Sequence, residues 1–154
     1  MLPTLYNNNY MQRKTTKEKL RKRNLGGMMY NFMIDIVRNV VYVELSGCLS
    51  FEQIMQYVDD LTYLKDKFEA RMYSMLVMAN RLDPLSQDNI PHFQKATELA
   101  LAWADKIAVV NGNRTLTLFQ VKRIEESARK VICTDTKIMR FKTKKDALIY
   151  LCTN

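Results

Sequence analysis

The sequence is poor in residues that interrupt regular structure, since only four of its 154 residues are glycine and three are proline. This composition excludes a loop-rich or low-complexity chain, and the 47% apolar content predicts one domain with a substantial core. No apolar run approaches the roughly 20 residues that span a membrane, and residues 24–31 do not form the apolar core of a signal peptide. We therefore expect a soluble, cytoplasmic protein.

Residues that carry metal or nucleophilic chemistry are also scarce. His92 is the only histidine, and the three cysteines, Cys48, Cys133 and Cys152, are far apart in the sequence. No pair of ligands has metal-binding spacing, so we expect no metal, no cofactor, no catalytic site and hence no enzyme. The odd number of cysteines favours reduced, buried thiols over a disulfide framework.

The net charge of +8 is distributed unevenly along the chain. Residues 1–26 carry seven basic side chains and one acidic, whereas residues 27–121 carry eight basic and eleven acidic. Residues 122–145 are basic again, with nine basic side chains and three acidic. We interpret residues 1–27 as a basic arm and residues 28–154 as the folded domain. The arm can contact nucleic acid, a polyanion or an acidic protein surface, or it is a solubilising tail or targeting segment; its candidate contact residues are Arg13, Lys14, Lys17, Lys19, Arg21, Lys22 and Arg23.

Hydrophobic periodicity predicts an α/β domain with the order β-β-α-β-α-β-α-β-α. Ser50 and Gln53 form a capping-box pattern ahead of the helix at 51–68, and Pro91 suits the first turn of the next helix. The predicted strands cover residues 30–37, 40–45, 72–78, 106–110 and 137–141, and the predicted helices cover residues 51–68, 91–103, 117–127 and 144–151.

The segments 72–78 and 106–110 are almost continuously apolar, which is typical of strands that are covered on both faces. We therefore expect both to be central strands, with Val77, Ile107 and Val109 buried. In contrast, the neighbouring carboxylates Asp59 and Asp60 on the helix at 51–68 suggest a solvated helix face or, alternatively, a carboxylate pair that binds a cation.

Residues 30–151 as a whole resemble the STAS superfamily, specifically its SpoIIAA-like branch, and three segments carry the resemblance. They are Val43-Glu-Leu-Ser-Gly47, the strand at 106–110, and the C-terminal pattern that starts at Met139-Arg-Phe-Lys-Thr and closes with Ala-Leu-Ile-Tyr-Leu151. The resemblance implies a mixed sheet of four or five strands with flanking helices. It also implies regulatory protein–protein contacts or, in some members, ligand binding.

The phosphoacceptor motif of the family's anti-sigma antagonists, Asp-Ser-Ser/Thr-Gly, is lacking in this sequence. The corresponding loop at 80–89 has no glycine and one hydroxyl side chain, Ser86. Ser86 is therefore the candidate phosphoacceptor, and the alternative is a solvated loop or capping residue.

A second candidate site joins the strand at 106–110 to the following helix. Amides at a helix N-terminus, together with an arginine, can hold an anion or ligand at the carboxyl edge of a parallel sheet. The alternative is a simple turn in which Thr115 or Thr117 caps the helix. The loop consists of Asn111, Gly112, Asn113, Arg114 and Thr115.

Three functions remain open from the sequence. The first is a non-enzymatic interaction or regulatory module that binds a protein partner. The second is a structural subunit of a large assembly, such as a virion or ribonucleoprotein, that uses the basic arm. The third is a carrier of a small apolar ligand or lipid, for which some of the ten methionines would line a cavity rather than fill the core.

Overall fold

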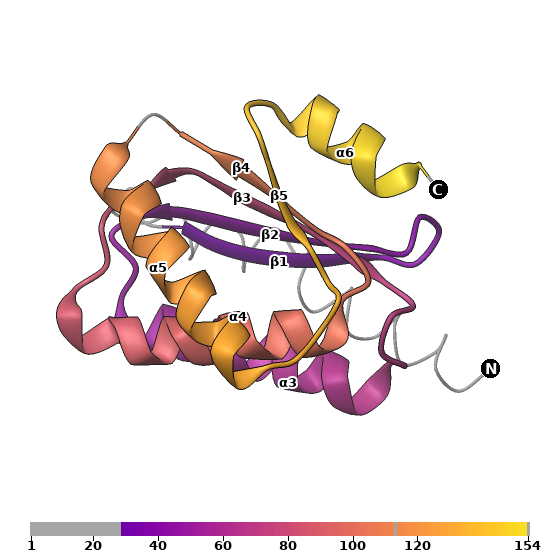
Figure 1. Cartoon of the computed structure of the whole chain (residues 1–154), viewed down its shortest axis with the longest axis horizontal. Helices are drawn as coiled ribbons and strands as arrows, with labels where there is room; N and C mark the ends of the chain where they lie inside the picture. The colour runs from indigo at the N-terminus through magenta and orange to yellow at the C-terminus, as the bar shows by residue number, and fades with distance from the viewer. Residues whose placement is uncertain (1–28, 113, 154) are drawn as a thin grey trace.

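The computed structural model describes residues 29–112 and 114–153, and its centre is a five-stranded mixed sheet. The strands follow one another in space in the order β1-β2-β3-β4-β5, with β1 antiparallel to β2 and the other pairs parallel (Figure 1). The elements in chain order are β1 (Met29–Asp35), β2 (Val40–Gly47), α3 (Phe51–Lys67), β3 (Ser74–Leu82), the short 3₁₀ turn η2 (Gln87–Asn89), α4 (Ile90–Trp103), β4 (Ile107–Asn111), α5 (Thr115–Val131), β5 (Ile138–Phe141) and α6 (Lys144–Cys152). The predicted α/β order and the mixed sheet are confirmed.

The three helices that connect parallel strands lie on the same face of the sheet. Each β-α-β crossover leads to the next strand in the same direction, and crossovers share one hand, so α3, α4 and α5 all pack on one side (Figure 1). Helix α6 follows the last strand and covers part of the opposite face, where Ala147 and Leu151 pack against β3 and β4. The larger core therefore lies under α3, α4 and α5.

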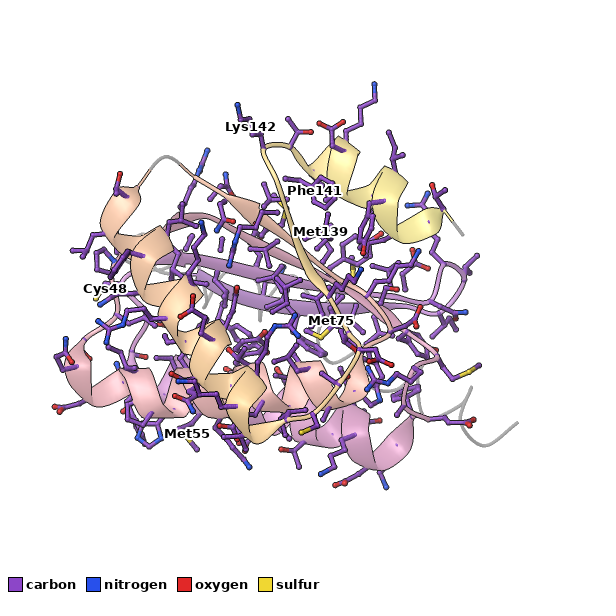
Figure 2. The ribbon with its side chains drawn as sticks, viewed as in Figure 1. Cys48, Met55, Met75, Met139, Phe141 and Lys142 are labelled. Atoms are coloured by element: carbon purple, nitrogen blue, oxygen red, sulfur yellow. The ribbon has the colours of Figure 1, made fainter. Side chains whose placement is uncertain are left out.

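The two inner strands β3 and β4 are buried on both faces. Met75 and Val77 face the helices α3–α5, as Figure 2 shows for Met75, while Leu76 belongs to the cluster under α6. Val77, Ile107 and Val109 are buried, which confirms their predicted places in central strands. The predicted start of β3 was wrong by two residues, because Met72 is exposed and pairing with β2 begins at Ser74.

Helix α3 begins at the predicted capping box. The Ser50 hydroxyl accepts from the Gln53 amide at 3.2 Å, and the Gln53 side chain accepts from the Ser50 amide at 2.9 Å. The helix presents Asp60 to the core instead of solvent, and its carboxylate accepts a 2.5 Å hydrogen bond from the Tyr30 hydroxyl of β1. The expected solvated face is therefore wrong at Asp60.

Arg71, in the connection between α3 and β3, joins three separate parts of the chain. Its guanidinium donates to the carbonyls of Leu101 at 3.4 Å and Ala104 at 2.6 Å, at the end of α4. The same group donates to the hydroxyl of Thr134 at 2.6 Å and to that of Thr136, both in the α5–β5 connection. Its backbone is left-handed, with φ of 70°, a conformation that costs a non-glycine residue energy. The side chain thus stabilises the C-terminal end of α4, where a cation is favoured.

The prediction of buried cysteines was wrong, because all three are exposed. Cys48 directly follows β2, as Figure 2 shows, Cys133 lies in the α5–β5 connection, and Cys152 ends α6. Each thiol therefore lies where the chain has left the sheet. Within residues 29–112 and 114–153, no helix combines the length and the apolar character needed to cross a membrane.

Candidate functional site

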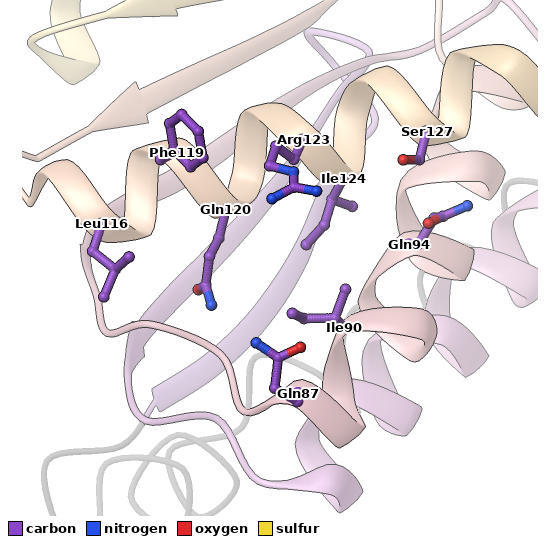
Figure 3. Close-up of a pocket in the computed structure, with 9 residues that line it drawn as sticks. All are labelled: Gln87, Ile90, Gln94, Leu116, Phe119, Gln120, Arg123, Ile124 and Ser127. Carbon is purple, nitrogen blue, oxygen red and sulfur yellow. The ribbon is translucent and has the colours of Figure 1, made fainter.

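The helices α4 and α5 border a groove of about 420 Å³ on the helix-covered side of the molecule. The turn η2 closes one end, so the walls come from η2, α4 and α5 (Figure 3). The groove is lined by Gln87, Ile90, Gln94, Leu116, Phe119, Gln120, Arg123, Ile124 and Ser127.

Large apolar side chains are exposed along this groove. Leu116 is 61% exposed and Phe119 is 60% exposed, both in the first turns of α5. Ile90 of α4 is partly buried and Ile124 is buried, so the groove continues inward from the exposed pair. Exposed apolar side chains that adjoin a hollow are typical of interaction sites, whereas isolated ones are common on any surface.

A paired hydrogen bond holds the groove in shape. The Gln120 side-chain nitrogen donates to the Leu85 carbonyl at 3.1 Å, and the Leu85 amide donates to the Gln120 side-chain oxygen at 2.8 Å. Leu85 is itself buried, so the loop before η2 is attached to α5 by polar and apolar contacts together. The groove is therefore preformed, which lowers the entropic cost of binding.

One basic side chain of the groove forms no ion pair within the described residues. Arg123 is exposed and lies between Gln120 and Ile124 in Figure 3. It makes no ion pair with a carboxylate of the described residues, whereas Arg114 pairs with Asp83 and Arg140 pairs with Glu125. The Arg123 guanidinium is therefore available to a bound molecule.

The predicted loop at 111–115 lies at the carboxyl edge of the sheet, and the side chains of Asn111 and Arg114 are engaged within the domain. Asn111 accepts a 2.9 Å hydrogen bond from Arg140 of β5, and Arg114 pairs with Asp83 of the loop after β3. Arg140 also pairs with Glu125 of α5. Burial raises the pKa of Glu125, and the Arg140 guanidinium opposes part of that shift.

Gly112 and Thr117 border a small hollow at the same edge. Its volume is about 10 Å³, close to the space of one water molecule. A side-chain carbon at Gly112 would collide with the Asn80 carbonyl, so the close approach of β3 and β4 requires glycine here. The Thr117 hydroxyl is buried without a hydrogen-bond partner among the described residues. Neither predicted threonine caps α5, because the helix begins at Thr115, with Arg114 in the capping position and no side-chain cap.

The strand order explains why this edge has no deep crevice. Parallel sheets bind ligands mainly where the strand order reverses and two connections diverge. In the described sheet the parallel strands β2 to β5 follow the chain order without reversal. Anion or ligand binding by the loop, in which Asn113 and its side chain fall outside the described residues, stays a prediction.

The other predicted residues lie in different places. Ser86 is exposed and precedes η2 without a side-chain capping bond, next to the groove residue Gln87, and its modification stays a prediction. The His92 ring packs edge-on against Phe51, with ring centres 5.0 Å apart. In the part of the chain that the structure describes, no group of three or more histidine, cysteine or acidic side chains has a geometry suited to a metal ion. The basic residues at 13–23 lie outside the described residues.

The sequence interpretation missed the α4–α5 groove. Its expected helix began at residue 117, which placed Leu116 in the preceding turn. The available signal was the apolar pair Leu116 and Phe119, which lies outside the buried stripe formed by Val121, Ile124 and Ala128. An apolar pair off the buried stripe of an amphipathic helix indicates a second contact surface.

A search with models of protein families finds no match to this chain, and a search of curated proteins also finds none. Among solved structures, the chain is similar to an uncharacterised protein of the DUF3478 family from Shewanella loihica PV-4, whose description gives it a SpoIIAA-like fold. The two chains share 19% sequence identity with a TM-score of 0.59, and the match covers 84% of this chain and 97% of the other. The predicted resemblance is thus confirmed at the level of architecture: this chain has a SpoIIAA-like fold.

Proposed function

We propose that the protein is a non-enzymatic interaction module that binds a protein partner in the groove between α4 and α5. The observation that carries this proposal is the exposure of Leu116 and Phe119, 61% and 60%, beside a groove of about 420 Å³. The SpoIIAA-like fold supports a compact module of this type but does not identify the partner.

The exposed pair can supply the anchor of an interface. Covering Leu116 and Phe119 removes on the order of 200 Å² of apolar surface, which corresponds to ~5 kcal/mol before the costs of association. Association itself consumes a comparable amount of free energy. The pair is therefore sufficient for a central contact, and a stable complex needs further contacts around it.

No described feature favours the other two functions to the same degree. An interior hollow between the sheet and the helices measures about 40 Å³, far below the ~300 Å³ or more of typical ligand pockets. The α4–α5 groove reaches that volume, but its apolar residues Leu116 and Phe119 are exposed to solvent rather than enclosed. A role in a larger assembly depends on the basic arm at 1–27, which lies outside the described residues. The carrier function would thus need a conformation with a larger cavity, and the assembly function would need the arm at 1–27.

Comparative capture of partners tests the proposal. The immobilised full-length protein is exposed to an extract of its native cells, in parallel with the double variant Leu116→Ser/Phe119→Ser and the control Ile149→Ser. Ile149 is a matched control because it is 57% exposed on α6, on the opposite face of the sheet. We expect a partner that the wild type and the control retain and the double variant loses by at least tenfold. The proposal is refuted if all three proteins retain the same set.

A further inference from the structure

Building on the function proposed above, we propose that the groove between α4 and α5 receives an acidic segment of the partner protein. In this arrangement an aromatic or branched aliphatic side chain of the partner enters beside Leu116, and a neighbouring carboxylate binds Arg123.

The shape of the groove indicates that it receives a bulky apolar side chain. Ile90 and Ile124 lie inward of the exposed Leu116 and Phe119, on opposite helices. The Gln120–Leu85 hydrogen-bond pair holds the end of the groove near η2, so the site is preformed for a bulky side chain. A segment that offered only polar groups would leave the exposed apolar pair in contact with water.

The charge at the groove indicates that the bound segment is acidic. Arg123 lines the groove and has no ion pair with a carboxylate of the described residues. The exposed residues of α5 include Lys122, Arg129 and Lys130 in addition to Arg123, against one exposed carboxylate, Glu126. The Glu125 carboxylate is already engaged by Arg140. Among the described residues that line the groove, Arg123 carries the one charge. Two carboxylates lie nearby, Glu98, which accepts a 3.1 Å hydrogen bond from Gln94, and Asp88 of η2. A carboxylate bound beside Arg123 would meet a positive charge, and charge complementarity favours an acidic partner.

The same charge disfavours two other occupants. Two copies of the chain that met groove to groove would place the basic residues of their α5 helices against one another. The chain's own arm at 1–26 carries seven basic side chains and one acidic, so it would be repelled in the same way. An acidic segment of another protein satisfies both the apolar and the charged features.

A phage-displayed library of random dodecapeptides provides the probe. Peptides are selected on the full-length wild-type protein, and those that fail to bind Leu116→Ser/Phe119→Ser are assigned to the groove. We expect the groove peptides to combine an aromatic or branched aliphatic residue with nearby aspartate or glutamate. Arg123→Glu should weaken a synthetic groove peptide at least tenfold. Lys145→Glu, the same charge change on α6, should change its affinity less than threefold.

A charge-swapped peptide gives the complementary measurement. When its aspartates and glutamates are replaced by lysine, the peptide should bind Arg123→Glu more tightly than it binds the wild type. If groove peptides show no acidic enrichment and ignore Arg123→Glu, the acidic partner is refuted while the interaction module stands. If no selected peptide depends on Leu116 and Phe119, the groove is not a docking site and both proposals fail. If light scattering shows a dimer that the double variant dissociates, the occupant is a second copy and the inference is wrong.

Discussion

Replacing Arg71 by alanine should destabilise the domain more than any other exposed arginine that the structure describes. The substitution removes hydrogen bonds to two carbonyls of α4 and to two threonine hydroxyls of the α5–β5 connection. Because Arg71 is largely exposed, each bond is assigned ~0.5–1 kcal/mol, well below the value for a buried charged group. We therefore expect a loss of ~2–4 kcal/mol in the free energy of unfolding, or about 10 °C in melting temperature.

A glycine at the same position separates the side-chain contribution from the backbone contribution. Arg71→Gly loses the same hydrogen bonds, but glycine adopts the φ of 70° without the ~1 kcal/mol or more that another residue pays. Arg71→Gly should therefore be more stable than Arg71→Ala, although the greater freedom of glycine in the unfolded chain offsets part of this difference.

Urea unfolding followed by tryptophan fluorescence measures both effects. Trp103 is the only tryptophan, it is buried, and its ring stacks on Tyr73 with centres 5.7 Å apart, close to the Arg71 contacts. Arg81→Ala is the matched control, since Arg81 is exposed near the opposite end of β3, and it should change stability by less than about 0.5 kcal/mol. The reasoning is refuted if Arg71→Ala stays within that limit, or if the glycine variant is the less stable of the two.

Three further predictions concern the carboxyl edge and the arm. Gly112→Ala should cost ~1–3 kcal/mol in urea unfolding, because the added carbon collides with the Asn80 carbonyl, and an unchanged midpoint would contradict the tight packing of β3 against β4. Burial raises the pKa of Glu125, so its stabilising contribution is full below the unfolded pKa of about 4.3 and is lost as the pH rises through the folded value. Relative to Glu125→Gln, the wild type should therefore lose stability from about pH 4 upward, and a constant difference across pH 4–7 would count against this. Deletion of residues 1–26 should shift the melting temperature by only a few degrees while weakening salt-sensitive binding to a partner or nucleic acid; a large loss of stability would show that the arm packs on the domain.

Local signals in the sequence were sufficient for the order of the elements and for the central strands. The capping box at Ser50 and Gln53 and the continuous apolarity around Val77 and Val109 depend on neighbouring residues alone. The structure retains these features because each one is determined by residues within a single helix or strand. The resemblance to the SpoIIAA-like branch rested on residues 43–47, 106–110 and 139–151, and it indicated the correct architecture.

Features that depend on distant parts of the chain were not predictable from these signals. Asp60 is buried on α3, and its hydrogen-bond donor, Tyr30 of β1, lies thirty residues earlier in the chain. The exposure of Cys48 and Cys152 follows from the places where β2 and α6 end. The groove requires α4, α5 and the loop held by Gln120 to meet, and no single segment carries that information.

The agreement between chain order and strand order has a consequence for synthesis on the ribosome. Each new strand from β2 onward pairs with the strand made just before it, so the sheet can grow at one edge as the chain emerges. No strand has to insert between two that are already paired, because each crossover, at 48–73, 83–106 and 112–137, leads to the strand that extends the growing edge. Until β5 and α6 emerge, however, the edge of β4 is unpaired and Ala108 and Val110 lack their cover. A translational pause after α5 would therefore leave an aggregation-prone intermediate. The short C-terminal segment at 138–152 then completes the sheet and covers its second face.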